Sequence, residues 1–105
     1  VLGITFKENV PDLRNSKVAQ VISRLADLGH SVTVHDPLAD PGEAAHEYGV
    51  ALDPEALSRR YDLVLLAVPH REYAEMGAPR LRALLDEGGT LADLKGIIGQ
   101  ADWSL

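Results

Sequence analysis

Residues 62–68 form a nearly continuous apolar run, Asp-Leu-Val-Leu-Leu-Ala-Val, and this run constrains the fold more than any other feature of the chain. A strand with one face in water alternates between apolar and polar residues, whereas a strand covered on both faces reads as continuous apolar sequence. The run therefore predicts a central strand with a layer of structure on each side.

Helical patterns flank this strand in the sequence. Residues 16–28 carry apolar side chains at the helical spacing, with Asn15 or Ser16 as the cap and Gly29 as the stop. We expect further helices over residues 43–48 and 78–87, a small helix that starts at Asp53-Pro54, and a short helix that opens in the stretch 69–73.

Strand patterns alternate with these helices at residues 1–6, 31–36 and 90–93, with a turn over 38–42 and a short extended piece over 50–52. The final residues, 97–105, are expected to form a terminal turn that packs on the body, with Trp103 as its anchor. Alternation of this kind is typical of α/β domains. We therefore predict a three-layer Rossmann-like fold with a mostly parallel sheet, in one domain over residues 1–105.

Composition excludes several classes of function. The formal net charge of -6 argues against nucleic acid and anionic membranes as partners. The chain has no cysteine, which removes disulfides and thiolate metal sites, and its apolar runs are shorter than a bilayer span. A cytoplasmic setting fits best. Because Val1 falls within or just before a predicted strand, we expect the chain to be a fragment of a longer protein.

The stretch from Phe6 to Ser16 joins a strand end to a helix start through a polar loop that contains Lys7 and Arg14. A helix N-terminus presents unpaired N–H groups and the positive end of the helix dipole, so anions bind there readily. Arginine can also hold a phosphate through two parallel hydrogen bonds. The stretch therefore predicts a phosphate-binding corner, in which Asp12 has a structural role as a partner of backbone N–H groups or of Arg14.

Four loops leave the carboxyl ends of the predicted strands, where open parallel sheets bind their ligands. Five polar residues lie in these loops or at their edges: Lys7, Arg14, Asp36, His70 and Lys95. We expect them to form one site.

Two of these residues have open alternatives. Asp36 stands where a dinucleotide-binding fold places the acid that holds a ribose, but the first loop has no G-x-G-x-x-G pattern, which favours a simple strand-ending turn. His70 fits a general acid or base, a phosphate contact or a solvent-exposed loop histidine. No histidines have metal-ligand spacing, so no metal site is expected.

The stretch from Gly3 to Ser16 resembles the C-terminal, UDP-binding domain of the UDP-glucose/GDP-mannose dehydrogenase family. The family pattern there is roughly G-x-x-F-K-x-x-x-x-D-x-R-x-S, and every fixed position is present. The resemblance covers essentially the whole chain through three further segments: His35-Asp36-Pro37, Ala67-Val68-Pro69-His70 and Asp93-Leu94-Lys95-Gly96. The variant of the loop is closer to relatives that act on UDP-N-acetylhexosamines than to UDP-glucose enzymes.

The resemblance implies a role for each matching residue. Phe6 and Lys7 would line the UDP-sugar site, and Arg14 would reach the pyrophosphate of NAD. Lys95 stands where many relatives have an arginine that binds the nucleotide-sugar. Lysine at this position keeps the charge but loses the bidentate geometry of a guanidinium group.

The resemblance also implies an NAD-dependent enzyme that oxidises the C6 alcohol of a UDP-sugar to a uronate, through a cysteine thiohemiacetal, for polysaccharide biosynthesis. This chain has neither a cysteine nor the NAD fingerprint. An N-terminal NAD-binding domain and a central region would supply them in a full-length homodimer, and this domain would bind without catalysing alone. Two other interpretations stay open: a free-standing nucleotide-binding or regulatory module, and a small enzyme that uses His70 with Asp36 or Asp93.

Overall fold

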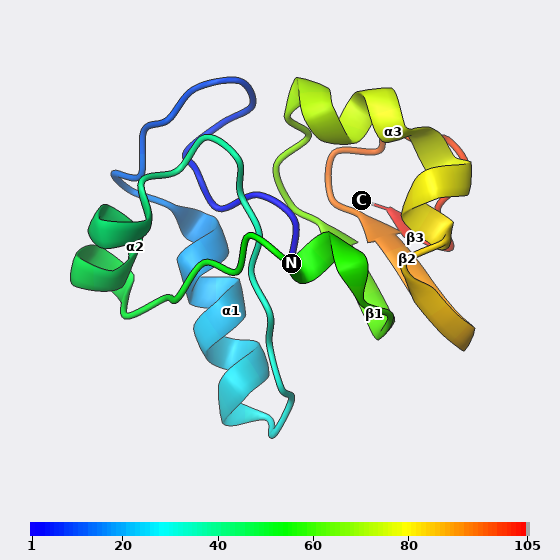
Figure 1. Ribbon diagram of the computed structural model, residues 1–105, viewed down its shortest axis with the longest axis horizontal. Helices are drawn as coiled ribbons and strands as arrows, with labels where there is room; N and C mark the ends of the chain where they lie inside the picture. The colour runs from blue at the N-terminus through cyan, green and yellow to red at the C-terminus, as the bar shows by residue number, and fades with distance from the viewer. Residues whose placement is uncertain (105) are drawn as a thin grey trace.

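A computed structural model describes residues 1–104, which form helices around a parallel sheet (Figure 1). The sheet contains β1 (Tyr61–Leu66), β2 (Leu85–Asp93) and β3 (Trp103–Ser104) in that spatial order, and both pairings are parallel. Isolated parallel bridges continue the sheet beyond β1, from Leu66 to Leu2, from Leu2 to His35 and from Val34 to Leu52. The mostly parallel sheet is confirmed.

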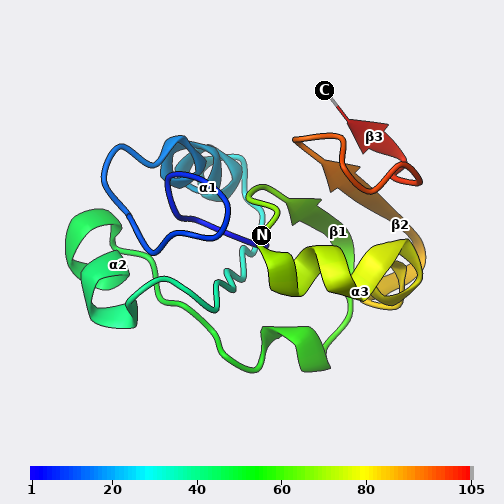
Figure 2. The same ribbon diagram turned by 90° about the horizontal axis from the view of Figure 1, so that it is seen from above.

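Helices cover both faces of this sheet. Val64 and Leu66 of β1 pack in a buried cluster with residues of α3 (Arg71–Arg82), whereas Leu65 and Ala67 pack in a second cluster with residues of α1 (Lys17–Asp27). Figure 2 shows α1 and α3 on opposite sides of β1. The strand is thus covered on both faces, as its apolar run predicts, and the three-layer Rossmann-like architecture is confirmed.

The helix boundaries follow local capping chemistry. The side chain of Ser16 accepts a hydrogen bond from the Ala19 amide and starts α1. Asp40 caps α2 (Pro41–Tyr48), which ends at the left-handed Gly49. The turn expected over residues 38–42 is therefore too long, because Asp40-Pro41 is a helix start. The small helix after Asp53-Pro54 is a 3-10 turn, η1 (Ala56–Ser58).

The expected helix over residues 78–87 is wrong in its second half. Helix α3 begins at Arg71, is interrupted by the non-helical Gly77 and ends at Arg82, and Leu85 already pairs with Tyr61 as the first residue of β2. Parallel pairing of Leu85 with Tyr61 satisfies backbone hydrogen bonds here and overrides the local helix propensity. The register is irregular just beyond, since Leu63 pairs with Thr90.

The first two expected strands are reduced to isolated bridges, at Leu2 in the first and at Val34 and His35 in the second. Gly3 has φ +91° directly after the Leu2 bridge, which ends the extended conformation. A Cβ atom at Gly3 would lie 2.6 Å from the Val68 Cβ, so only glycine permits this approach.

The terminal segment forms β3, and Trp103 keeps 48% of its surface exposed. Trp103 therefore packs on the body only in part, as a residue of a strand rather than as the anchor of a turn. Leu105 lies outside the described residues. Among the residues that the structure describes, no helix has the length and apolar character needed to cross a membrane.

Candidate functional site

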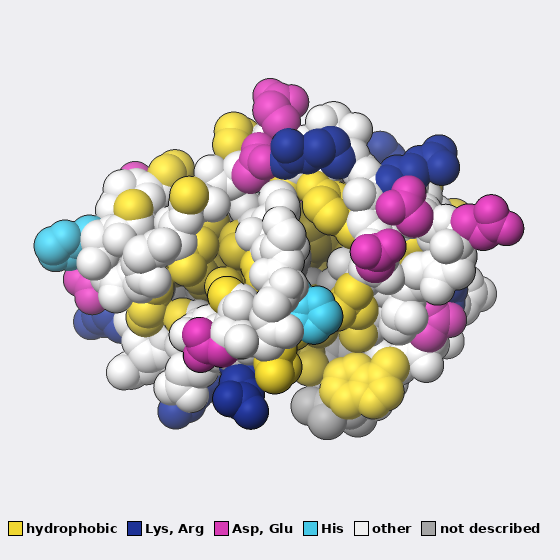
Figure 3. Space-filling view, turned by 90° about the horizontal axis from the view of Figure 1, so that it is seen from below, with side chains coloured by type: hydrophobic (Ala, Val, Ile, Leu, Met, Phe, Trp, Pro, Cys, Tyr) yellow, Lys and Arg dark blue, Asp and Glu magenta, His cyan; other side chains and the backbone are white. Residues whose placement is uncertain are grey.

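The loops that follow the parallel strands meet at one edge of the sheet, at the top of Figure 1. They comprise residues 3–16, 36–40, 67–70 and 94–96. The opposite edge, seen in Figure 3, carries acidic and basic side chains interspersed over its surface. The predicted grouping of loops at the carboxyl edge is thus present, but its polar residues fall into a buried set and an exposed set.

The buried set is centred on a hydrogen bond between His70 and the Asp36 carboxylate. The distance from His70 Nε2 to Asp36 Oδ2 is 2.9 Å, and both side chains are fully buried. The carboxylate also accepts backbone N–H bonds from Ile4 at 2.7 Å and from Leu38 at 2.8 Å. Burial alone would raise the pKa of Asp36, but the hydrogen bonds from His70, Ile4 and Leu38 outweigh burial and lower it. Asp36 is therefore an anionic anchor for two loops.

His70 connects this anchor to the loop that contains Lys7. Its Nδ1 atom accepts a hydrogen bond from the Asn9 amide at 2.9 Å, and its Nε2 atom also lies 3.2 Å from Thr5 Oγ1. Since His70 is fully buried, its interpretation as a solvent-exposed loop histidine is wrong. Both ring nitrogens already have protein partners, so neither is free to exchange a proton with a substrate.

The loop supported in this way presents its tip to solvent. Phe6 is 56% exposed, and Lys7 is also exposed. The Phe6 amide donates to the Asp12 carbonyl at 2.6 Å, which closes the loop. Asn9 has φ +65°, and its Oδ1 atom accepts from the Arg71 amide at 2.7 Å. An aromatic ring and a cation thus stand on a rigid base at the carboxyl edge.

Arg14 lies on the other side of the same loop and is held by Asp12. Arg14 Nε and Nη2 donate to the two Asp12 carboxylate oxygens at 3.1 and 3.0 Å. These bonds lower the pKa of Asp12 and raise that of Arg14. The structural role predicted for Asp12 is therefore confirmed. The pair remains open to solvent, since 84% of the Arg14 side-chain surface is exposed.

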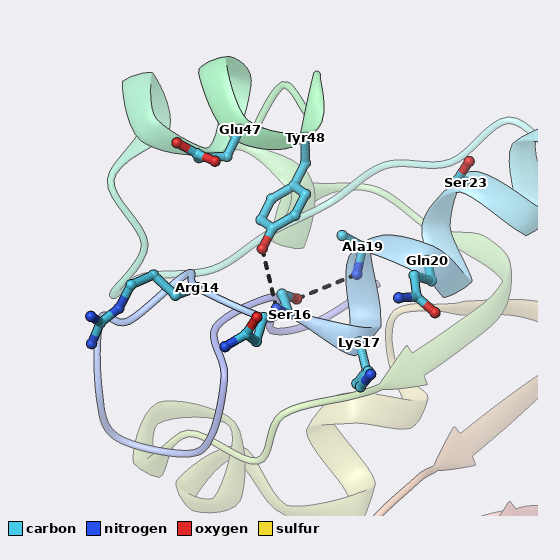
Figure 4. A pocket seen from close by; sticks show the side chains of 9 residues that line it. Arg14, Ser16, Lys17, Ala19, Gln20, Ser23, Glu47 and Tyr48 are labelled. Carbon is cyan, nitrogen blue, oxygen red and sulfur yellow. Dashed lines mark hydrogen bonds between the residues drawn. The ribbon is translucent and has the colours of Figure 1, made fainter.

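A shallow groove runs from Arg14 along the first turn of α1 toward α2 (Figure 4). Lys17 and Gln20 of α1 and Glu47 and Tyr48 of α2 line it. Tyr48 Oη donates to the Leu13 carbonyl at 2.5 Å and accepts from the Ser16 amide at 3.1 Å, so α2 fixes the backbone on both sides of Arg14.

Lys95 is exposed on the loop after β2, and the buried Asp93 shapes that loop. Asp93 Oδ1 accepts from the amides of Lys95 and Gly96 at 3.2 and 3.1 Å, and Oδ2 accepts from Ile98 at 2.7 Å. A carboxylate that binds amides a few residues ahead of it is a common turn-forming device.

Sequence reasoning missed Thr5, Asn9 and Tyr48, all of which support the site. Asn9 had a detectable signal, because asparagine is one of the few residues that readily adopt positive φ. Tyr48 had none, since its partners lie more than thirty positions away. Among residues 1–104, no cluster of three or more histidine or acidic side chains is arranged to hold a metal ion.

Comparison with known proteins places the whole arrangement in a family. Residues 1–100 match the sequence model of the UDP-glucose/GDP-mannose dehydrogenase family, UDP binding domain. The chain is 45% identical to Protein CapL of Staphylococcus aureus over 98 residues, which cover 93% of this chain and 23% of that protein. It is 40% identical to UDP-N-acetyl-D-glucosamine 6-dehydrogenase of Pseudomonas aeruginosa over 100 residues, which cover 95% of this chain and 24% of that enzyme.

The similarity extends more weakly to UDP-glucose 6-dehydrogenase of Rhizobium meliloti, with 29% identity over 99 residues. The chain thus spans about a quarter of the length of the curated relatives it matches. The match over nearly all of its residues, on a fold whose loops meet at the edge described above, shows that the chain belongs to the UDP-glucose/GDP-mannose dehydrogenase family, as a UDP binding domain.

Proposed function

We propose that this chain is the UDP-sugar-binding domain of an NAD-dependent UDP-sugar 6-dehydrogenase. The observation that carries the proposal is the placement of Lys7 and Lys95 at the carboxyl edge, exposed on loops that buried acidic residues hold in place. Two such cations would neutralise the diphosphate of a nucleotide-sugar, and Phe6, next to Lys7 in the chain, offers an exposed aromatic ring. These are positioning and electrostatic roles.

The substrate would be a UDP-N-acetylhexosamine, and the product a uronate used in polysaccharide biosynthesis. Support comes from the relatives at 40% and 36% identity, both UDP-N-acetyl-D-glucosamine 6-dehydrogenases. The chain contains no cysteine. Its contribution would be to hold the nucleotide-sugar while other parts of a longer homodimeric enzyme in the cytoplasm carry out the oxidation.

NAD would act as the hydride acceptor, and Arg14 is the residue of this chain that would contact it. Two of the guanidinium nitrogens of Arg14 are bound to Asp12, and the exposure of the side chain leaves its outer face open to an anion. That arrangement fits one contact to a pyrophosphate, with most NAD contacts made by an N-terminal domain.

An amide NMR titration with UDP, followed by NAD, tests the proposal on this chain. We expect saturable UDP shifts at Lys7 and Lys95, weakened in Lys7→Gln and Lys95→Gln. Arg24→Gln is the matched control, because it removes the same charge from the last turn of α1, away from the carboxyl edge. Equal weakening in all three variants would indicate only non-specific attraction of an anion.

The sequence of the gene and an assay of turnover separate the rival interpretations. A free-standing regulatory module would bind UDP on its own, but its gene would lack an upstream G-x-G-x-x-G region and cysteine. A small self-sufficient enzyme would show turnover with a UDP-sugar and NAD. The occupied ring nitrogens of His70 argue against that enzyme.

A further inference from the structure

We propose that His70 is a positioning residue for the nucleotide-sugar: as the neutral Nε2–H tautomer, it fixes the loop that carries Phe6 and Lys7 without touching the ligand. The inference rests on the proposed function for its ligand. Its structural part, the tether from His70 to that loop, stands on contacts of this chain alone.

The imidazole ring of His70 contacts the Lys7 loop at both ends. Nδ1 accepts the Asn9 amide at 2.9 Å, on the far side of Lys7. Nε2 lies 3.2 Å from the Thr5 hydroxyl, which itself donates to the Lys7 carbonyl at 3.0 Å. The residues two before and two after Lys7 are therefore both connected to one ring.

The partners of His70 define its protonation. A backbone amide only donates, so Nδ1 must be the unprotonated nitrogen that faces Asn9. The Asp36 carboxylate accepts, so Nε2 bears the proton and donates to Asp36 at 2.9 Å. The opposite tautomer, or a doubly protonated ring, would direct an N–H group at the Asn9 N–H and break the tether.

The loop tip has few other supports. The Asn9 side chain accepts from the Arg71 amide, next to His70 in the chain, and the Phe6 amide bonds to Asp12. Phe6, Lys7 and Glu8 are all exposed. The ring itself is well fixed, since it is fully buried, with its centroid 5.9 Å from that of Tyr73. Loss of the Nδ1 acceptor should therefore release the tip while the surrounding core stays in place.

Two substitutions divide the functions of the ring. His70→Gln can place an amide N–H near the Nε2 position and keep the donor to Asp36, but it removes the acceptor for Asn9. His70→Asn can place a carbonyl oxygen near the Nδ1 position and keep that acceptor, but it loses the donor to Asp36. Both variants have neutral amide side chains, so they differ mainly in which bond remains.

We expect His70→Gln to weaken UDP binding roughly tenfold, because a binding group that is displaced by a fraction of an ångström loses much of its effect. His70→Asn should bind within about twofold of wild type, although it loses the buried bond to Asp36 and unfolds more easily. Hydrogen exchange at the Asn9 amide should be slow in wild type and in His70→Asn, and fast in His70→Gln. If affinity instead follows stability, with His70→Asn the weaker binder, the positioning role is overturned.

Nitrogen NMR of the His70 ring in the wild-type chain without ligand tests the tautomer directly. The expected spectrum shows an unprotonated Nδ1 and a protonated Nε2, and the reverse assignment would overturn the tether. Suppose that wild type shows that spectrum and slow Asn9 exchange but still fails to bind UDP. In that case the tether from His70 to the loop stands, but the proposed function is wrong, and the ligand part of this inference is wrong with it. If UDP binds but Asn9 exchanges fast in wild type, the tether alone is wrong.

Discussion

Two loops of this domain each present a lysine at the carboxyl edge of the sheet, but they are held in different ways. The Lys7 loop depends on residues far away in the chain, since the partner of the Asn9 amide, His70, is 61 positions away. The Lys95 loop depends on Asp93, which accepts bonds from amides two to five positions ahead. Tertiary structure therefore fixes the first loop, whereas local sequence fixes the second.

The difference has consequences for both stability and binding. Disturbing the supports of the Lys7 loop should affect the core, because Asp36 and His70 are fully buried and serve several segments. Disturbing the support of the Lys95 loop should stay local, because the amides bound by Asp93 are only partly buried and can reach water.

The largest expected effect is at Gly3, where the Lys7 loop begins. Gly3→Ala would place a Cβ atom 2.6 Å from Val68 Cβ and 2.7 Å from the Val68 carbonyl oxygen, at φ +91°. Overpacking and backbone strain together should lower the free energy of unfolding by about 3 kcal/mol or more in urea denaturation.

Gly29→Ala is the matched control for Gly3→Ala. Gly29 has φ +94° but nothing within 4 Å of a Cβ position, so only the backbone strain remains. We expect a loss of about 1 kcal/mol for this variant. Equal losses at the two glycines would mean that the approach to Val68 is easily relaxed and that the base of the Lys7 loop is less constrained than its contacts indicate.

The next largest effect is expected at Asp36, which can be compared directly with the second buried carboxylate, Asp93. Asp36→Asn replaces one carboxylate oxygen by an NH2 group, which then faces N–H donors such as His70 Nε2. We expect the free energy of unfolding to fall by about 3 kcal/mol. Asp93→Asn retains an acceptor for part of its local loop and should cost about 1 kcal/mol. Urea denaturation of both variants at neutral pH checks the difference, and equal costs would contradict the division into a distant and a local support.

The pH dependence of stability distinguishes Asp36 further. Because its pKa in the folded state is lowered, its stabilisation is fully present above the unfolded-state pKa of about 3.9 and is lost as the pH falls through the lower folded value. Acid denaturation of wild type should therefore contain a component that Asp36→Asn lacks. If the stability of the two proteins falls with pH in the same way at acidic pH, the Asp36 carboxylate does not contribute to stability as an anion.

The difference between local and distant supports also explains how much of the fold could be predicted from the sequence. Helix α1 and its cap at Ser16 depend on adjacent residues, and the burial of β1 on both faces depends on its own composition. The strand at Leu85 could not be predicted, because its partner Tyr61 is supplied by tertiary structure.

The site follows the same logic. The cations at the carboxyl edge were predictable from loop position, and the turn at Asp93 from its local chemistry. The turn in which Asp36 accepts from the Leu38 and Ala39 amides was predictable in the same way. The bond between Asp36 and His70 was not, because each residue sits in a loop that also suits an exposed polar residue. Only the folded chain brings Thr5, Asn9 and Asp36 around one imidazole ring.

A smaller effect is expected at Tyr48, which supports the backbone near Arg14. Tyr48→Phe removes the bonds of the hydroxyl group to Leu13 and Ser16 and should cost about 1–2 kcal/mol. Tyr61→Phe, which removes the bond from its hydroxyl group to the Ala56 carbonyl, is the control. In backbone NMR relaxation, we expect new mobility at residues 13–16 only in Tyr48→Phe. Mobility there in both variants would mean that the loop responds to overall stability rather than to its own tether.

The smallest effect on stability is expected for the Asp12–Arg14 pair, which belongs to the same loop but lies in solvent. Asp12→Asn keeps an oxygen for the Arg14 amide and removes the charge that binds the guanidinium group. Exposed ion pairs contribute little, so the urea midpoint should not move measurably. The free guanidinium should instead bind inorganic pyrophosphate more tightly, with larger amide shifts at Arg14 than in wild type. A clear loss of stability would show that the outer part of the loop also depends on this pair, and unchanged pyrophosphate binding would show that Asp12 does not compete for Arg14.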